Sequence, residues 1–198
     1  IVNDSVSLIR NPDGSLSEVV TTYFSDGSIK SIRTINIESD GDGASTIENG
    51  QGQVISTETL DVNSDAHTQF FDKQNFDSDG ELQSEGTFSV VANGEAFANI
   101  KGQGFEADVE NAVVNFAPNT EARIDGDGNT FFFDDNASGT VVGRNNTFLA
   151  AAGADYTVFG DNNTLFLDEG QSATINGENQ FILASGGNLT LLSGASGM

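Results

Sequence analysis

The sequence predicts an all-β protein whose C-terminal half is a parallel β-solenoid with coils of seventeen residues. Three observations carry this prediction. Glycines recur at intervals of seventeen residues in the C-terminal half, and strand-like runs alternate with Asp-Gly or Asn-Gly turns in the N-terminal half. No stretch of about ten residues has apolar residues at the three- and four-residue spacing of an amphipathic helix.

The seventeen-residue repeat is visible in several columns at once. The glycine column is Gly126, Gly143, Gly160, Gly177 and Gly194. Three residues later lie Asn129, Asn146, Asn163 and Gln180, and five residues later lie Phe131, Phe148, Leu165 and Ile182. Fifteen residues after the glycines lie Val141, Val158, Ile175 and Leu192. A fixed period of this length is typical of stacked supersecondary units, and it is too short for a helical hairpin.

Stacking gives each column a structural role. The apolar columns are expected to fill the interior, and the Asn column to form a ladder in which each side-chain amide bonds the next. The glycines are expected at tight corners where a side chain would clash or where φ is positive. A degenerate coil begins near Phe105, so we expect four to five coils over residues 105–198.

One column does not fit an interior position. Six residues after each glycine lie Phe132, Leu149, Phe166 and Leu183, and the columns on both sides of them are also apolar. Because side chains alternate along a strand, either the strand bends here or this column points outward. An outward column is covered by the N-terminal half or contacts another molecule.

The N-terminal half reads as a meander of strands joined by Asp-Gly turns over residues 1–104, with the solenoid repeats over 105–198. Its strand-like runs are 15–25, 28–38, 53–62, 68–76 and 82–92. We expect antiparallel hairpins whose apolar face is closed by packing on itself or on the solenoid. An irregular continuation of the solenoid is the alternative.

Composition excludes several classes of function. The chain of 198 residues has 30 acidic and 7 basic residues and a net charge of −23, which argues against nucleic-acid binding. Without cysteine it has no disulfide or thiolate site, and its single histidine, His67, excludes a multi-histidine metal centre. No apolar run approaches ~20 residues, so we expect no membrane insertion.

Two acidic segments are candidate calcium sites. Each has Asp residues at alternate positions, a Gly, and a Glu five residues after that Gly, so that carboxylate oxygens could converge on a hard cation. The candidate ligands are Asp40, Asp42 and Glu48 in one segment and Asp77, Asp79 and Glu85 in the other. The alternative is a pair of hairpin turns, where Asp and Gly are favoured for backbone reasons.

No set of residues indicates catalysis, so we predict no enzymatic activity. A solenoid that acts on acidic polysaccharides needs basic residues near the substrate, and the repeat region contains only Arg123 and Arg144, in different columns. Arg144 replaces an acidic residue of its column, which favours a salt bridge to a neighbouring coil. Carbohydrate binding or action on a polysaccharide is the alternative function.

The C-terminal segment predicts self-association. Residues 188–194 are strand-like, apolar and uncharged, and an uncapped terminal coil exposes a strand edge that can pair with another chain. We expect head-to-tail association of copies, in which this segment or the strand near Val6–Ile9 pairs with a neighbour. The candidate contact residues are Phe132, Leu149, Phe166, Leu183, Leu189 and Leu191.

The repeats also resemble a family. The segments Asp13–Ser15 and Val19–Thr22, the run Asp26–Thr34, and the coil Val141–Phe148 are similar to repeats of bacterial secreted hemolysin-type (RTX-like) and adhesin-type exoproteins. The Gly-Gly-x-Gly-x-Asp nonapeptide of the RTX calcium roll is absent. The resemblance implies a secreted, extracellular protein of the cell surface or matrix, such as a biofilm matrix, and it implies no catalytic residue.

Overall fold

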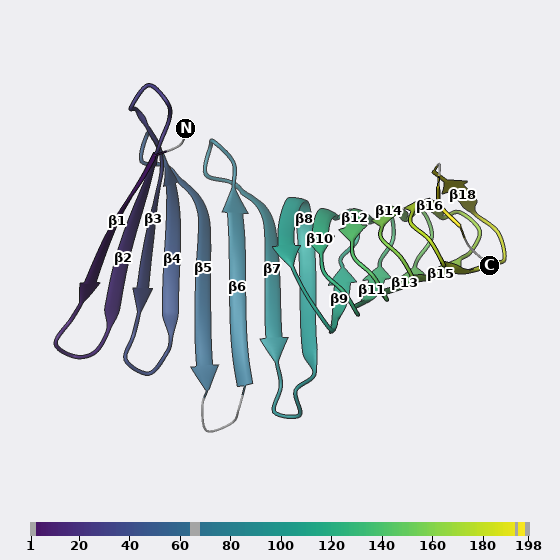
Figure 1. The fold of residues 1–198 in the computed structure, drawn as a ribbon, viewed down its shortest axis with the longest axis horizontal. Helices are drawn as coiled ribbons and strands as arrows, with labels where there is room; N and C mark the ends of the chain where they lie inside the picture. Colours follow the sequence, from purple (N-terminus) through teal and green to yellow (C-terminus); the bar gives the residue numbers. More distant parts are fainter. Residues whose placement is uncertain (1–2, 64–67, 193, 197–198) are drawn as a thin grey trace. The chain divides into compact units, whose positions relative to one another are not determined.

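The structure, a computed structural model, describes residues 3–63, 68–192 and 194–196 (Figure 1). His67 lies outside the described residues. All regular structure in the described residues is β-strand, as predicted. Accordingly, the described part of the chain contains no helix that could cross a membrane. The chain divides into two compact units, Ile1–Gly94 and Glu95–Met198.

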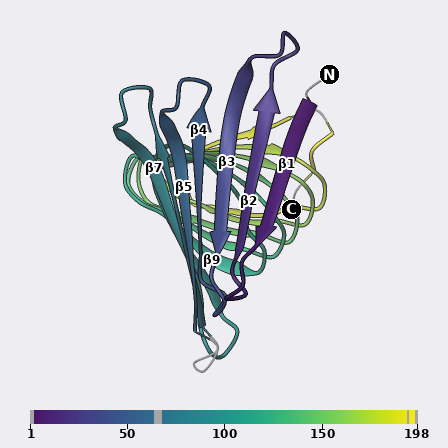
Figure 2. The same cartoon turned by 90° about the vertical axis from the view of Figure 1, so that its left-hand side faces the viewer.

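The first unit is an antiparallel meander, as expected for the N-terminal half (Figure 2). Each strand pairs with the next in the chain. The strands are β1 (Asn3–Arg10), β2 (Leu16–Tyr23), β3 (Ile29–Ile37), β4 (Gly43–Asn49), β5 (Val54–Asn63), β6 (Thr68–Phe76) and β7 (Leu82–Val90). The strand β4 was not predicted, because six of its seven residues are small or polar and Ile47 is its single large apolar residue.

The Asp-Gly turns form three-residue hairpin loops. In the first, the N–H of Gly14 donates to the carbonyl of Asn11 (3.1 Å), and the N–H of Asn11 donates to the carbonyl of Ser15 (2.9 Å). Gly14 has φ of 93°, which a glycine adopts without strain. The hydroxyl and the backbone N–H of Ser15 both donate to Asp13, and they hold the pKa of that carboxyl below its usual value.

The first unit has no buried apolar core in its described residues. Its buried side chains are the small residues Ser45, Ser56 and Ser84, whereas the buried apolar residues lie between Ala98 and Ile175. The expectation that the meander closes its apolar face by packing on itself is therefore wrong. A single layer of strands has two faces, and a meander of this length does not fold back to cover either of them.

The second unit is a parallel β-solenoid, as predicted (Figure 1). Its strands are β8 (Ala96–Asp108), β9 (Ala112–Phe116), β10 (Glu121–Asp125), β11 (Thr130–Phe133), β12 (Ser138–Val142), β13 (Thr147–Ala150), β14 (Asp155–Phe159), β15 (Thr164–Leu167), β16 (Ser172–Asn176), β17 (Phe181–Ala184) and β18 (Asn188–Leu191). These strands form two sheets. One, which we call the odd-strand sheet, contains residues 96–100 of β8 and the strands β9, β11, β13, β15 and β17. The other, which we call the even-strand sheet, contains residues 103–108 of β8 and the strands β10, β12, β14, β16 and β18.

The described residues form about six coils, more than the four to five expected. The additional coil is β8, whose residues 96–100 pair with β9 and whose residues 103–108 pair with β10. Gly102 and Gly104, both at positive φ, lie at its bend. This coil has neither the glycine nor the Asn of the other coils, so it was not predicted. The solenoid therefore begins at Ala96 and not at residue 105.

The predicted interior columns are buried. Phe131, Phe148 and Leu165 have 0% exposure, as do Val141, Val158 and Ile175. The Phe148 ring stacks on Phe131 (5.2 Å between centroids) and on Tyr156 (5.5 Å). Burial raises the pKa of Tyr156, whose hydroxyl has no hydrogen-bond partner among the described residues.

The last coil is shorter than the others, which corrects one predicted column. Leu191, rather than Leu192, pairs with Ile175, and Thr190 pairs with Thr174. A deletion of one residue in the preceding turn therefore keeps both the apolar and the Thr columns in register. The Thr column of the even-strand sheet consists of Thr140, Thr157, Thr174 and Thr190.

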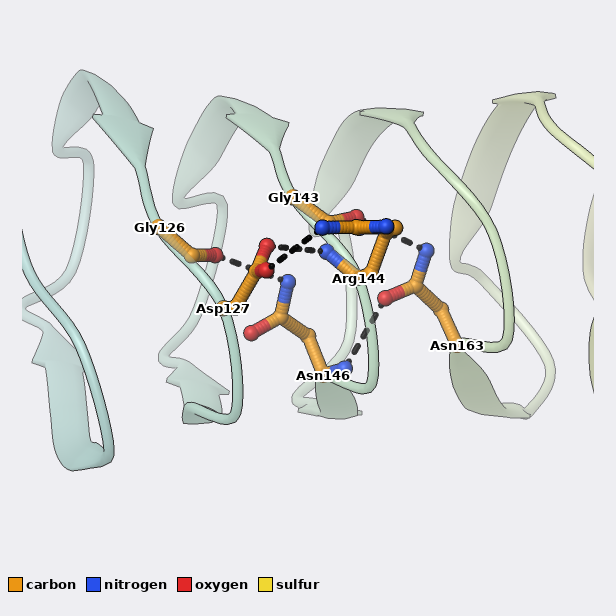
Figure 3. A network of polar contacts seen from close by, with 6 residues as sticks. All are labelled: Gly126, Asp127, Gly143, Arg144, Asn146 and Asn163. Carbon is orange, nitrogen blue, oxygen red and sulfur yellow. Dashed lines mark hydrogen bonds and ion pairs between the residues drawn. The ribbon is translucent and has the colours of Figure 1, made fainter.

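The corner after the even-strand sheet explains the Gly and Asn columns (Figure 3). A Cβ on Gly143 would lie 1.9 Å from the carbonyl oxygen of Gly126, so no side chain fits there. Asn146 is buried, its Oδ1 accepts from the N–H of Asn129 (2.8 Å), and its Nδ2 donates to the carbonyl of Gly126 (3.1 Å). The Asn column thus bonds the backbone of the previous coil, and the predicted amide-to-amide ladder is wrong, because each corner leaves an N–H and a C=O that the side chain satisfies.

The opposite corner uses a column that the sequence analysis missed. Its residues have left-handed backbone with φ of 54–82°, and they also recur every seventeen residues. They are Asn119, Asn136, Gly153, Gly170 and Gly187. Asn and Gly are the residues that adopt this conformation most readily, so a column that contains only Asn and Gly was the available signal.

Candidate self-association surfaces

The column of Phe132, Leu149, Phe166 and Leu183 points outward from the odd-strand sheet. Phe132 is 41% exposed, although its neighbours Phe131 and Phe133 are buried. The strand therefore alternates regularly and does not bend. Paired in register across the parallel strands, the four side chains form a continuous apolar stripe on the surface of the second unit.

On the outer face of the odd-strand sheet, residues 96–100 of β8 and the strands β9, β11, β13, β15 and β17 carry no charged side chain, and the charged residues Lys101, Asp134 and Asp168 follow directly at one edge of this face. Beside the apolar stripe runs a Thr column, and the amide of Asn115 donates to Asn99 (3.0 Å) in the first two coils. The outward residues are Phe97, Asn99, Val113, Asn115, Thr130, Phe132, Thr147, Leu149, Thr164, Phe166, Phe181 and Leu183. We call this surface the uncharged face.

The even-strand sheet presents a different surface. A hollow of about 310 Å³ lies over β8, β10, β12 and β14, and Glu106, Glu121 and Asp155 line it together with Arg123. Arg123 forms an ion pair with Asp125 (3.0 Å) on the same strand. Hydroxyl groups of Ser138, Thr140 and Thr157 complete the lining. The second unit is thus uncharged on one sheet and rich in carboxylates on the other.

The terminal coil exposes positions that are interior in the other coils. Leu191 is 46% exposed, whereas its pairing partner Ile175 is 0% exposed. Leu189 is 40% exposed, whereas its partner Ala173 is 2% exposed. Within the described residues β17 and β18 each pair with one strand, and so does β1 of the first unit. Their outer edges present backbone groups that another strand can bond.

The candidate calcium ligands lie at or beside hairpin turns. Asp40 accepts from the N–H of Asp42 (3.2 Å), and Asp42 accepts from the N–H of Val62 (2.8 Å). Asp77 accepts from the N–H of Asp79 (2.8 Å) and of Glu81 (3.0 Å). Both bonds lower the pKa of Asp77, and the bond from Glu81 has the larger effect.

Glu48 and Glu85 lie within strands β4 and β7, outside these turns. Across the described residues we find no group of three or more Asp, Glu, His or Cys side chains placed to hold an ion. The turns use their carboxylates as backbone caps, and calcium binding stays a prediction.

If either acidic turn binds calcium, the ion will stabilise the fold by mass action, by about 2.7 kcal/mol at a concentration of 100 Kd. The measurement is a thermal melt in calcium and in EDTA at matched ionic strength, because screening alone stabilises a chain of charge −23. We expect a higher Tm in calcium, and an Asp79→Asn variant that reduces the difference. Equal melting temperatures would show that neither acidic turn binds calcium.

Arg144 has the structural role expected for it. Its guanidinium lies 3.4 Å from the Asp127 carboxylate of the previous coil, and its backbone N–H donates to the same carboxylate (2.7 Å; Figure 3). Asp161 likewise accepts from the N–H of Glu178 (2.8 Å). The acidic residues of this column thus cap the next coil, and Arg144 separates two of them.

We find no significant similarity between the chain and any family model, curated protein or solved structure. The surfaces described above are therefore the observations on which a function can be proposed.

Proposed function

We propose that the protein is a non-enzymatic structural and adhesive protein of a bacterial surface or extracellular matrix, and that it associates with copies of itself into filaments. The uncharged face of the solenoid is the observation that carries this proposal. Two chains of charge −23 repel each other over most of their surface. A face without charge is where such chains approach at the lowest electrostatic cost.

The same face offers an attractive contribution. Its apolar stripe repeats at the ~4.8 Å spacing of neighbouring strands, and four large side chains form a patch of a few hundred square ångströms. Leu189 and Leu191 on β18, the last strand of the even-strand sheet, form a separate exposed apolar surface. Burial of this surface against a second copy removes it from water.

The strand edges supply direction. The edge of β18 and the edge of β1 can each accept a strand from a neighbour by backbone hydrogen bonding. Such a contact joins two different surfaces, so it extends into a filament and does not close as a dimer. The secreted location follows from the resemblance to adhesin-type repeat exoproteins and is part of the proposal.

A second candidate function, carbohydrate binding, is favoured by the hollow on the even-strand sheet. Its carboxylates, hydroxyls and Arg123 offer the hydrogen-bonding groups that sugar hydroxyls require. Retention of the protein on a polysaccharide column, lost in an Asp155→Ala variant that sediments like the wild type, would support this function.

The proposal predicts the behaviour of a stripe variant, Phe132→Lys combined with Phe166→Lys. Both residues are exposed, at 41% and 38%, so the fold should persist. The wild type should show concentration-dependent large species in sedimentation velocity, and the variant should need at least a tenfold higher concentration to form them. The added lysines reduce the net negative charge, so general repulsion cannot explain the loss.

The matched control adds two lysines to the other sheet, as Thr157→Lys with Thr174→Lys. These residues lie outward on β14 and β16. The control should associate at least as readily as the wild type. If the stripe variant and the control sediment alike, the uncharged face is not the contact surface.

A further inference from the structure

The N-terminal sheet has one face that is more apolar than the other. Strand register places Leu16, Ile37, Leu60, Phe71 and Phe88 in one row across the sheet, with Gly43 of β4 at its centre. The Phe71 and Phe88 rings are 5.7 Å apart. Val20 and Ile35 lie on the same side. We call this side the row face.

The row face is open to solvent. Ile37 is 41% exposed and Leu60 is 37% exposed, and no apolar residue in the described part of this unit is buried. Because Gly43 has no side chain, a shallow hollow of about 130 Å³ lies between Ile37 and Leu60. A row of apolar side chains over several strands is typical of a sheet that packs on a second layer.

The charges of the row face balance, unlike those of the whole chain. The register places three acidic and three basic residues on it, a net charge of zero in a chain of −23. They are Asp4, Glu18, Glu58, Arg10, Arg33 and Lys73. The opposite face carries the carboxylates of Glu48, Asp61, Asp72 and Glu85. The row face is therefore suited to approach by another copy of this polyanion.

We propose that two copies pack row face against row face. Their twofold axis lies between the two sheets, above β4 and parallel to it. Such an axis places β3 over β5 of the second copy and β2 over β6. It then brings Ile37 onto Leu60 of the second copy and sets Gly43 against Gly43. The contact is isologous, so each pair occurs twice.

The same axis pairs opposite charges. Glu18 and Lys73 lie in one row, on β2 and β6 at equal distance from β4. The twofold axis therefore places Glu18 opposite Lys73 of the second copy, and Leu16 opposite Phe71. Arg33 bonds Glu58 of its own chain at 2.8 Å. In the dimer it faces Ser56 of the second copy, so it meets no like charge. One symmetry operation thus matches both the apolar and the charged positions.

The area suits a stable dimer. Seven strands at ~4.8 Å spacing and about eight residues at ~3.4 Å rise give a face of about 900 Å². Two such faces bury about 1,800 Å², within the range of stable interfaces. Sheets that pack in this way lie ~10 Å apart with strands within about 30° of parallel.

This dimer is independent of the filament contacts, which lie on the solenoid and on strand edges. The test therefore uses the full chain with Phe166→Lys, which weakens association through the uncharged face. Sedimentation equilibrium should give the mass of a dimer for this protein. If the uncharged face makes no contact, the wild type also gives this dimer and forms no larger species. The filament proposal can therefore fail while the dimer proposal holds.

Charge reversal tests the axis. Glu18→Lys places lysine against Lys73, and Lys73→Glu places glutamate against Glu18, twice in each dimer. Each single change should raise the dimer Kd at least about a hundredfold, because like charges directly opposed in an interface are strongly unfavourable. The double reversal, Glu18→Lys with Lys73→Glu, should restore the Kd to within about tenfold of the starting value.

The matched control is Glu48→Lys, the same change of charge on the opposite face of β4. It should leave the dimer intact. A protein that is monomeric at all concentrations would overturn the proposal, and so would a dimer that survives Glu18→Lys or that the double reversal does not restore.

Discussion

Replacing Phe148 by Asp is expected to unfold the solenoid. The Phe148 ring is fully buried between Phe131 and Tyr156, and a carboxylate there would lose this packing and have no partner. Loss of the packing costs about 3–5 kcal/mol and the buried charge several more, which together match the stability of a typical domain. Circular dichroism and limited proteolysis should show a disordered second unit.

The matched control is Phe132→Asp. Phe132 occupies a strand of the same sheet but points outward, and it is 41% exposed. A charge at this position stays in water, so its effect on stability should be within about 1 kcal/mol. If Phe148→Asp melts like Phe132→Asp, the buried and exposed columns have been assigned to the wrong sides.

Replacing Asn146 by Leu is expected to cost about 2–6 kcal/mol of the free energy of unfolding. The change leaves the N–H of Asn129 and the carbonyl of Gly126 without partners in a buried corner, at about 1–3 kcal/mol each. Leu has the same number of side-chain heavy atoms as Asn in the same branched arrangement, so the lost hydrogen bonds dominate the effect. Urea denaturation followed by circular dichroism measures the difference.

Asn99→Leu serves as the comparison. Asn99 is exposed and accepts one hydrogen bond, from Asn115 (3.0 Å), which water can replace. Its effect should be within about 0.5 kcal/mol. A similar cost for both Asn variants would mean that the buried corner bonds contribute little beyond ordinary surface contacts.

The repeat columns were predictable because stacking enforces them. A coil that sits on its neighbour must match it position by position, so Phe131, Phe148 and Leu165 had to keep their chemistry. The glycine column was equally visible, because the carbonyl of Gly126 leaves no space for a side chain at Gly143. The outward direction of Phe132 also followed from strict alternation once the strand was known to be straight.

Other features could not be predicted because they depend on register or on partners elsewhere in the chain. The strand β8 forms a full coil without the repeat residues, because its bend is made by Gly102 and Gly104. The pairing of Leu191 with Ile175 depends on a deletion whose position only the register reveals.

The candidate surfaces show the same division. The apolar stripe was predicted, because its four residues share one column of the repeat. The row face was not, because Leu16, Ile37, Leu60 and Phe71 become neighbours only when four hairpin registers are known. Its charge balance likewise appears only after each side chain has been assigned to a face.

We propose that the chain assembles with itself through the uncharged face of the solenoid. Negative-stain electron microscopy of the purified wild type, beside the variant with Phe132→Lys and Phe166→Lys, is the decisive experiment. We expect filaments for the wild type and none for the variant at the same concentration. Filaments of equal length and number in both samples, or single particles in the wild type at every concentration, would contradict it.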